Sequence, residues 1–529
     1  MTVRDATFEV LRRRGMTKIF SNPGSTEVPF LVDLPADLEF VLALHEGSVV
    51  GIATGWALGR GEPAFVLLHT TPGLGNAVSA LATARVNRAP LVVAVGQQDR
   101  RHLALEPFLT GKLAGLAGDY PVWADQPVRP QDVPGALERA WHEAQTGRGP
   151  ALVIVPMDDW LAAAPERHEH AAPERLIRAA AADDAAVEEL AHLLEQSESP
   201  ALVVGAGADD LETWAALVQL AERLVAPVWQ ESFGARAGFP QDHPLYAGDL
   251  PADRTRLRET LSGHDVVLAV GAPVFRQYAY VEGPFVAEGT TVALVTDDPA
   301  EAHRSPAQLA VLAPPASVCA ALAERVPQRD AELPSLEPPP APPAPEGPLR
   351  AGHVLAELAA RLPREAVVLE EAPSNRPELL ARLRARDNLG LVSPAMGGLG
   401  FAMPAAIGLR LALPSRPVVA VVGDGSSLYA IQSLWSAAAY GAGALFVILR
   451  NGGYAVMDRL AEREGGAPPW PRVDVDVASL AEAFGCKARR IADLEGLRQA
   501  LDDVIPGLVD RAEPLLLEVT VEPDPVFEP

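Results

Sequence analysis

Residues 418–454 read VVAVVGDGSSLYAIQSLWSAAAYGAGALFVILRNGGY, and this stretch decides the local fold. Two apolar runs, 416–422 and 444–450, have the composition of buried strands, and a glycine-containing turn follows each. Between them, apolar residues recur at helical spacing and predict one helix starting after Ser426: Leu428, Ile431, Leu434 and Trp435. A strand–helix–strand unit places both strands in one parallel sheet with a right-handed crossover.

Polar side chains follow both of these strands. Asp424 follows the first and Asn451 follows the second, and open α/β sheets bind ligands at this carboxyl edge. Carboxylate and amide oxygens suit Mg²⁺ or Ca²⁺ better than a soft metal. The flanking glycines leave room for a bulky anion, and N–H groups at the start of the helix favour its charge. A GDG turn alone is weak evidence, but with NGG at this spacing it predicts a metal-bridged diphosphate site.

The rest of the 529-residue chain repeats the same strand–helix alternation. Apolar runs typical of strands buried on both faces fall into three blocks, 1–165, 183–328 and 349–529. The stretch 164–182 is rich in Ala and Pro, and residues 334–348 form a Pro-rich linker that predicts an extended, solvated spacer. The expected fold class is therefore α/β, with three doubly wound parallel-sheet domains.

Charge and composition exclude several kinds of partner. The net charge of −25 argues against nucleic acid and against an anionic membrane surface, because both need a basic face. No uncharged apolar run approaches the roughly 18 residues that span a bilayer. The two cysteines, Cys319 and Cys486, offer neither a disulfide framework nor metal-ligand spacing. With an N-terminus that starts as an amphipathic helix, these features predict a cytoplasmic protein.

Several segments resemble the thiamine diphosphate (ThDP) enzymes, most of all the benzoylformate decarboxylases. GDGS followed by NGG is similar to the diphosphate-and-metal motif of that family, and the similarity extends in order over nearly the whole chain. It includes SNPGSTEVPFL, LALHEGSVVGIATGWA, LLHTTPGLGNA, GHDVVLAVGAPVFR and MGGLGFAMPAAIGLRLALPSRPVVAVVGDGS. The resemblance implies pyrimidine-binding, middle and diphosphate-binding domains. It also implies a homo-oligomer, commonly a tetramer built from dimers, with each active site between two subunits.

The resemblance assigns cofactor roles to single residues. The metal, Mg²⁺ or Ca²⁺, falls to the side chains of Asp424 and Asn451 and to the backbone carbonyl of Gly453. Leu399 matches the apolar residue that props ThDP in its bent form, and Gly397 lies where a carbonyl receives the aminopyrimidine. Further positions expected beside the cofactor are Ser374, Gly423, Gly425, Ser426 and Tyr454.

Three residues of the first block carry the implied catalytic roles. Glu46 matches the glutamate that bonds the aminopyrimidine and activates the cofactor, and His69 matches a histidine that transfers protons near neutral pH. Ser25 matches the serine that hydrogen-bonds the substrate carboxylate or the alkoxide that forms during the reaction. Taken alone, each has an ordinary alternative: a solvent-facing glutamate, a structural histidine and a helix N-cap. His45 has no role that the family suggests.

Two positions depart from the family. Tyr278 stands where benzoylformate decarboxylases have a second histidine, and tyrosine is a much weaker acid, with a reference pKa of about 10. Leu460 replaces an aromatic pocket residue. The other residues expected around the substrate are Phe108, Leu109, Val456 and Met457. The pocket thus stays apolar but changes shape, and benzoylformate itself is left open as the substrate.

These features predict a ThDP- and Mg²⁺-dependent decarboxylase that converts a small 2-oxo acid to an aldehyde. Loss of the second histidine favours an alternative, a carboligase of the acyloin or acetolactate synthase kind. A homologue that binds ThDP without turnover is a third possibility, kept open by Tyr278. A fourth, an oxidoreductase with a dinucleotide such as FAD in the middle domain, rests on VVGAGADDLE at 203–212, where Asp210 replaces the third glycine of the fingerprint.

Overall fold

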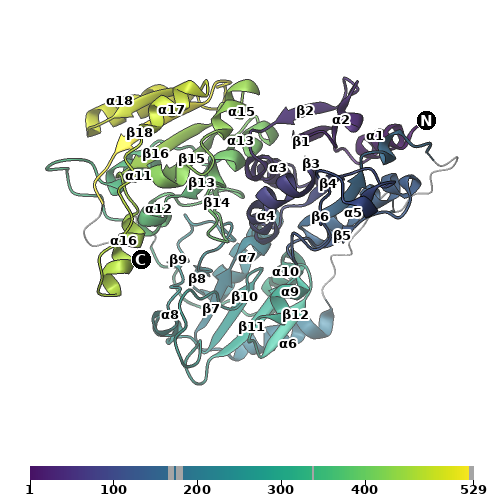
Figure 1. The fold of residues 1–529 in the computed structure, drawn as a ribbon. Helices are drawn as coiled ribbons and strands as arrows, with labels where there is room; N and C mark the ends of the chain where they lie inside the picture. The colour runs from purple at the N-terminus through teal and green to yellow at the C-terminus, as the bar shows by residue number, and fades with distance from the viewer. Residues whose placement is uncertain (165–171, 174–182, 336–338, 524–529) are drawn as a thin grey trace.

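The computed structural model describes residues 1–164, 172–173, 183–335 and 339–523. Three six-stranded parallel sheets, each flanked by helices, follow one another along the chain (Figure 1). The first and third lie side by side, and the second lies beneath them in this view. The expectation of three doubly wound sheets is therefore confirmed. Most of the stretch 164–182 lies outside the described residues.

The first sheet has the strand order β2-β1-β3-β4-β6-β5. Three of its inner strands, β3, β4 and β6, are buried along their whole length, as the uniformly apolar runs predicted. The strands are β1 (Lys18–Asn22), β2 (Glu39–Leu42), β3 (Ala64–Leu68), β4 (Leu91–Gln97), β5 (Trp123–Asp125) and β6 (Pro150–Pro156). The helices are α1 (Val3–Arg13), α2 (Val28–Leu31), α3 (Glu46–Arg60), α4 (Thr70–Val86) and α5 (Val133–Gly147).

The second sheet has the order β12-β11-β10-β7-β8-β9. Its strands are β7 (Pro200–Val204), β8 (Val228–Gln230), β9 (Tyr246–Asp249), β10 (Val266–Val270), β11 (Thr291–Thr296) and β12 (Leu309–Leu312). Its helices are α6 (Asp184–Gln196), α7 (Leu211–Leu224), α8 (Arg254–Leu261), α9 (Pro299–His303) and α10 (Pro315–Arg325). Arg88, which follows α4 of the first block, pairs with Asp297 and Glu301 beyond β11 and so links the two blocks.

The third sheet has the order β14-β13-β15-β16-β18-β17. Its strands are β13 (Val367–Glu371), β14 (Leu391–Val392), β15 (Val418–Gly423), β16 (Leu445–Arg450), β17 (Lys487–Ile491) and β18 (Leu515–Thr520). Its helices are α11 (Ala351–Ala359), α12 (Arg376–Arg382), α13 (Ala402–Ala412), α14 (Asp424–Ser427), α15 (Ser433–Ala439), α16 (Ala455–Arg463), α17 (Val477–Ala483) and α18 (Leu494–Val504).

One hydrophobic core joins the first and third blocks. Buried side chains of α3 and α13 belong to the same cluster, and the two helices cross closely (Figure 1). A Cβ on Gly55 would overlap the Ala405 carbonyl, and one on Gly408 would overlap the Ile52 carbonyl. Glycine at both crossing points lets α3, which starts at Glu46, pack closely against α13 of the third sheet.

The single helix predicted after Ser426 is wrong. The chain forms the short helix α14, turns through residues 428–432, and resumes as α15. Backbone N–H groups in the turn bond three residues back, as in Tyr429 to Ser426 and Ala430 to Ser427. Tyr429 packs against Gly400, and Ser436 donates to the Leu42 carbonyl at 2.8 Å. These contacts with other segments outweigh the local helical preference.

The Pro-rich linker is more than a solvated tether over residues 339–348. His353 Nε2 lies 2.9 Å from the Pro343 carbonyl, and Arg382 donates to the Pro340 carbonyl at 3.0 Å. The linker therefore runs along α11 and α12 rather than free in solvent. The prolines of this stretch are exposed or half-buried, in keeping with an extended segment that joins no sheet.

Candidate active site

Asp424 and Asn451 lie at the carboxyl ends of two paired strands. β15 and β16 are parallel neighbours, with Gly423 opposite Leu449, so the residue after each strand reaches the same edge. Asp424 is buried, and its two carboxylate oxygens accept from the N–H groups of Gly425 at 3.0 Å and Gly452 at 2.7 Å. Burial raises the pKa of Asp424 above its ordinary value. The predicted neighbourhood of these two side chains is confirmed.

The glycines around them have separate physical reasons. Gly452 has a φ of 67°, a left-handed conformation that glycine adopts without strain. A Cβ on Gly425 would lie 2.6 Å from the ring of Tyr454, whereas one on Gly453 would meet nothing within 4 Å. Asn451 Oδ1 accepts from the Gly453 N–H at 3.0 Å, which holds the Asn451 side chain against the backbone of Gly453. The set offers only oxygen donors, which fits a hard divalent cation.

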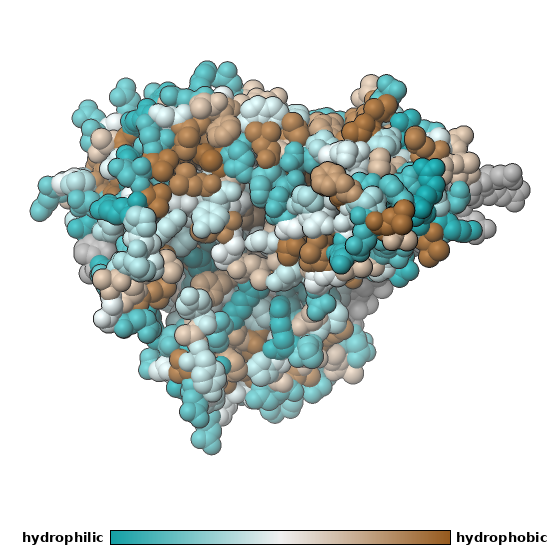
Figure 2. All heavy atoms as spheres, in the orientation of Figure 1, coloured by the Kyte–Doolittle hydropathy of each residue, from teal (hydrophilic) through white to brown (hydrophobic). Residues whose placement is uncertain are grey.

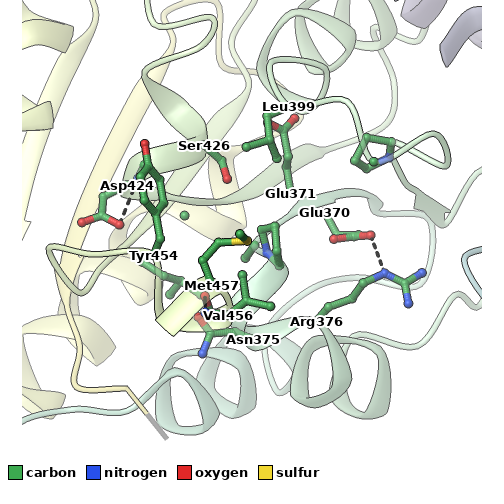
Figure 3. Close-up of a pocket in the computed structure, with 18 of the residues that line it drawn as sticks. Glu370, Glu371, Asn375, Arg376, Leu399, Asp424, Ser426, Tyr454, Val456 and Met457 are labelled. Carbon is green, nitrogen blue, oxygen red and sulfur yellow. Dashed lines mark hydrogen bonds and ion pairs between the residues drawn. The ribbon is translucent and has the colours of Figure 1, made fainter. Parts of the chain in front are cut away.

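These residues line one cavity of about 370 Å³, drawn in Figure 3. Asp424 and Tyr454 lie on one side of it, and Leu399 and Ser426 lie above the centre. Ser374 also belongs to its wall and accepts from the Val456 N–H at 3.1 Å. The cavity brings together these residues expected from the sequence: Tyr278, Ser374, Gly397, Leu399, Gly423, Asp424, Gly425, Ser426, Asn451, Gly453, Tyr454, Val456, Met457 and Leu460.

Glu46 begins α3 in the first block and does not line this cavity. Its side chain is buried, which excludes the solvent-facing alternative. Asn22 donates to one carboxylate oxygen at 3.1 Å and Asn76 donates to the other at 3.0 Å. His45 caps the helix by accepting from the Gly47 N–H at 3.0 Å, so it has a structural role.

His69 stands at the end of β3 and contacts a glutamate that the sequence reasoning missed. Its Nδ1 lies 3.0 Å from Glu27 Oε2 and 2.9 Å from Thr26 Oγ1. Glu27 is almost completely buried and also accepts from the Gly24 N–H at 2.8 Å. The hydrogen bond with Glu27 raises the pKa of His69; burial opposes this, and the charges of Glu27 and Glu46 add to it. The only signal in the sequence was a glutamate two residues after Ser25.

Ser25, Phe108 and Leu109 also lie away from the Asp424 cavity. Ser25 is exposed in the turn before α2 and is not the N-cap of that helix, because Glu27 occupies that position. Phe108 is 87% exposed, so in the single chain it packs against little. Within one chain, these residues of the first block therefore do not contribute to the Asp424 cavity.

Tyr278 lies in the cavity wall, and its side chain is largely exposed. Its ring centroid is 6.1 Å from that of Phe233, another lining residue that the sequence did not suggest. Leu460 lines the same cavity from α16. Both departures from the family therefore face the space beside the expected cofactor site.

Glu371, at the end of β13, is a second missed acid. Its buried carboxylate accepts from the N–H groups of Gly400 at 2.6 Å, Phe401 at 2.8 Å and Ala402 at 2.6 Å. Burial raises its pKa to about 7, although the three N–H groups favour the charged form. Glu371 thereby fixes the loop that carries Gly397 and Leu399 to the start of α13. The signal was the pair of acids that ends the apolar run AVVLEEA.

The glycines of the middle sheet are explained by packing. The Gly207 N–H donates to the Gly271 carbonyl at 2.8 Å, and a Cβ on Gly207 would lie 2.7 Å from Gly271 Cα. Asp210, in place of a third glycine, caps α7 through the Thr213 N–H. The loops after β7 and β10 thus need glycine to approach each other, whether or not a dinucleotide binds.

Three family profiles match the chain. They are the thiamine pyrophosphate enzyme N-terminal TPP binding domain over residues 1–115, the central domain over 187–322 and the C-terminal TPP binding domain over 379–519. Benzoylformate decarboxylase of Pseudomonas aeruginosa is 40% identical, over 99% of this chain and 100% of that protein. The chain belongs to the thiamine diphosphate-dependent enzyme family.

Solved structures of ThDP enzymes agree in fold. The ThDP-dependent 4-hydroxybenzoylformate decarboxylase of Rhodococcus jostii RHA1 superposes with a TM-score of 0.92 at 37% identity, over 99% of this chain and 100% of that one. Benzoylformate decarboxylase of Polynucleobacter necessarius gives 0.93 at 34%, over 100% and 99%. An acetolactate synthase large subunit of Parasynechococcus marenigrum is 28% identical, over 96% of this chain and 86% of that protein. ThDP is the cofactor whose binding domains the chain carries.

Proposed function

We propose that this ThDP enzyme is a 2-oxo acid decarboxylase that releases an aldehyde from an aryl substrate of the benzoylformate kind. The observation that carries the proposal is the single cavity lined by Asp424, Asn451 and Leu399, in a chain similar over its full length to a benzoylformate decarboxylase. When bound, ThDP supplies a thiazolium that accepts the electron pair left as CO₂ departs.

The residues of the third block hold the cofactor in this proposal. Asp424, Asn451 and the Gly453 carbonyl bind Mg²⁺ or Ca²⁺, which in turn holds the diphosphate. Ser426 and Gly425 lie at the same sheet edge, and Gly397 and Leu399 support the rings from the wall above. Support comes from the oxygen-only donor set and from the glycines that keep Cβ atoms out of this space.

The residues of the first block work in the active site of a second subunit. Glu46 bonds the aminopyrimidine, Ser25 binds the substrate carboxylate, and His69 holds and moves a proton at its imidazole. Support comes from the position of all three away from the Asp424 cavity of their own chain, and from an exposed apolar loop containing Leu105 and Phe108. We propose a tetramer built from dimers; light scattering after gel filtration measures its mass.

The decisive experiment supplies ThDP and MgCl₂ to the purified protein and identifies products from benzoylformate and from aliphatic 2-oxo acids. Release of CO₂ and one aldehyde supports the decarboxylase. The observation that favours a carboligase is Tyr278, which stands where the family has a histidine. A phenol is a poorer proton donor to the product carbon near neutral pH than an imidazole. Acyloin or acetolactate as the main product would favour the carboligase. A separate absorbance scan for flavin tests whether the middle domain binds FAD.

We further propose a cytoplasmic location and three domain boundaries. Within the described ranges, no helix combines the length and the hydrophobicity that a membrane crossing requires. Both cysteines are buried and unpaired, which supports a cytoplasmic location. We propose the domain boundaries 1–165, 183–328 and 349–529, with 334–348 as the linker. Limited proteolysis that cuts first in 164–182 and 334–348 would support them.

A further inference from the structure

An ion pair lies in the cavity wall on the side away from Asp424 (Figure 3). Glu370 precedes Glu371 in β13, and Arg376 is the first residue of α12. Arg376 Nε donates to Glu370 Oε1 at 3.0 Å, and the side chains are 21% and 3% exposed. Two charged groups therefore line a cavity whose other walls include apolar side chains.

The pair leaves hydrogen-bonding capacity unused. Glu370 Oε1 also accepts from Ser393 Oγ at 2.5 Å, so that oxygen has two donors. Within the described part of the chain, Glu370 Oε2 has no donor, and the two terminal nitrogens of Arg376 have no acceptor. Glu370 lines the cavity, so a ligand group that donates to Oε2 would replace water there and add a charge-assisted hydrogen bond.

The walls around the pair suit a flat apolar body. The Arg376 guanidinium lies 5.5 Å from the ring centroid of Phe233, which in turn contacts Tyr278. Met457 and Leu460 line the cavity from α16. An aromatic ring between these side chains would direct a substituent toward Glu370 and Arg376, while the 2-oxo acid end faces the side of Asp424.

Charge decides which substituent fits. Glu370 and Arg376 neutralise each other, and the buried Glu371 and Asp249 lie nearby, so a second carboxylate on the substrate meets no net positive charge. A cationic tip would be repelled by Arg376. A hydroxyl donates to Glu370 Oε2 and accepts from Arg376, and thus uses both free groups.

We propose that Glu370 and Arg376 select an aromatic 2-oxo acid that carries a neutral hydroxyl at its far end. This inference rests on the proposed decarboxylase function. The competing explanation is that the pair only ties α12 to β13 and Ser393. The two differ in one respect, because a purely structural pair does not distinguish substrates that differ in one distal group.

The test measures kcat and KM of the ThDP- and Mg²⁺-loaded enzyme with 4-hydroxy-, 4-methoxy- and 4-methylbenzoylformate. The hydroxyl compound should exceed the methyl compound in kcat/KM by at least about tenfold, because a site built to bind a hydroxyl rejects analogues that lack it. The methoxy compound, which accepts but cannot donate, should be intermediate. Most of the difference is expected in KM, since binding of the distal group changes little between ground and transition states.

Two variants locate the preference. Arg376→Met should reduce the ratio of hydroxyl to methyl to near unity. Glu370→Gln puts a donor where the acceptor was, so the preference for hydroxyl over methoxy should disappear. The matched control is Arg382→Met, on the same helix but outside the cavity, which should keep the parent ratios. Thermal unfolding and ThDP titration show which variants remain folded. One folded variant, Arg376→Met or Glu370→Gln, is enough for the test.

The outcomes separate the two proposals. No turnover of any 2-oxo acid would overturn the proposed function. Turnover with equal kcat/KM for hydroxyl and methyl compounds would overturn only this inference. So would a hydroxyl preference that survives in both Arg376→Met and Glu370→Gln. Calorimetric titration with 4-hydroxybenzaldehyde and benzaldehyde gives a readout without catalysis. 4-Hydroxybenzaldehyde should bind the parent more tightly than Arg376→Met, whereas benzaldehyde should bind both proteins equally.

Discussion

The imidazole of half-buried His69 pairs with the buried carboxylate of Glu27, with Nδ1 3.0 Å from Oε2. Glu27 is held in turn by Thr26 and by the Gly24 N–H. The pair fixes which way the imidazole faces, because Nδ1 is engaged and Nε2 is left for other contacts. A glutamate of the turn before α2 therefore positions the histidine proposed to move protons.

Glu27→Gln should lower the pKa of His69, because the bond to Glu27 is the largest cause of its elevation. NMR titration of the imidazole measures the shift without catalysis. The raised pKa means that the charged pair stabilises the fold most below about pH 6.5 and loses this effect as the pH rises through the folded-state pKa. The variant should lose that pH dependence. Glu39→Gln, at the exposed position of β2, is the control; an unchanged titration in Glu27→Gln would contradict the positioning role.

Asp424→Ala should weaken ThDP binding in the presence of Mg²⁺ by at least about 30-fold, which corresponds to roughly 2 kcal/mol for one lost charged ligand. Fluorescence titration with ThDP, with and without Mg²⁺, measures this. Asp474→Ala is the matched control, because Asp474 pairs with Arg450 at the end of the same β16 but is largely exposed. Equal ThDP affinity in the parent and Asp424→Ala, with no response to Mg²⁺, would remove the basis of the proposed site.

The two glycines on either side of the site should respond differently to alanine. In Gly425→Ala the new methyl meets the Tyr454 ring at 2.6 Å, so the ring must move and ThDP affinity should fall. In Gly453→Ala the methyl meets nothing, and a ligand provided by a backbone carbonyl is retained. ThDP titration of both variants should therefore show loss only in the first. Equal loss in both would argue against a carbonyl ligand at residue 453.

Tyr278→His should raise the yield of aldehyde relative to acyloin. Imidazole is a far better proton donor than phenol near pH 6.5, and general acid catalysis is worth about 10²–10⁴-fold where it limits the rate. Tyr278 is 74% exposed, so the change should leave stability intact. Tyr280→His, two residues further on and also largely exposed, is the control. Product analysis by chromatography gives the ratio, and an identical ratio in parent and variant would show that residue 278 takes no part in protonation.

The sequence determined the parts of this protein that depend on neighbours along the chain. Apolar runs separated by helices fixed the three parallel sheets, since such strands must be buried on both faces. Asp424 and Asn451 follow consecutive strands of one crossover unit, so their approach needed no knowledge of the remaining chain. The glycines beside Asp424 and Asn451 belong to the tight turns that end these two strands, and the sequence shows them directly.

Tertiary structure decided the parts that depend on distant segments. The turn at 428–432 arises where Tyr429 meets Gly400 and α15 meets the first sheet. The bond between Glu27, before α2, and His69, after β3, joins residues 42 positions apart, and Ser393 reaches Glu370 from 23 residues away. Local composition carries no information on such pairs, because their energy comes from burial and hydrogen bonding that exist only after the sheets have packed.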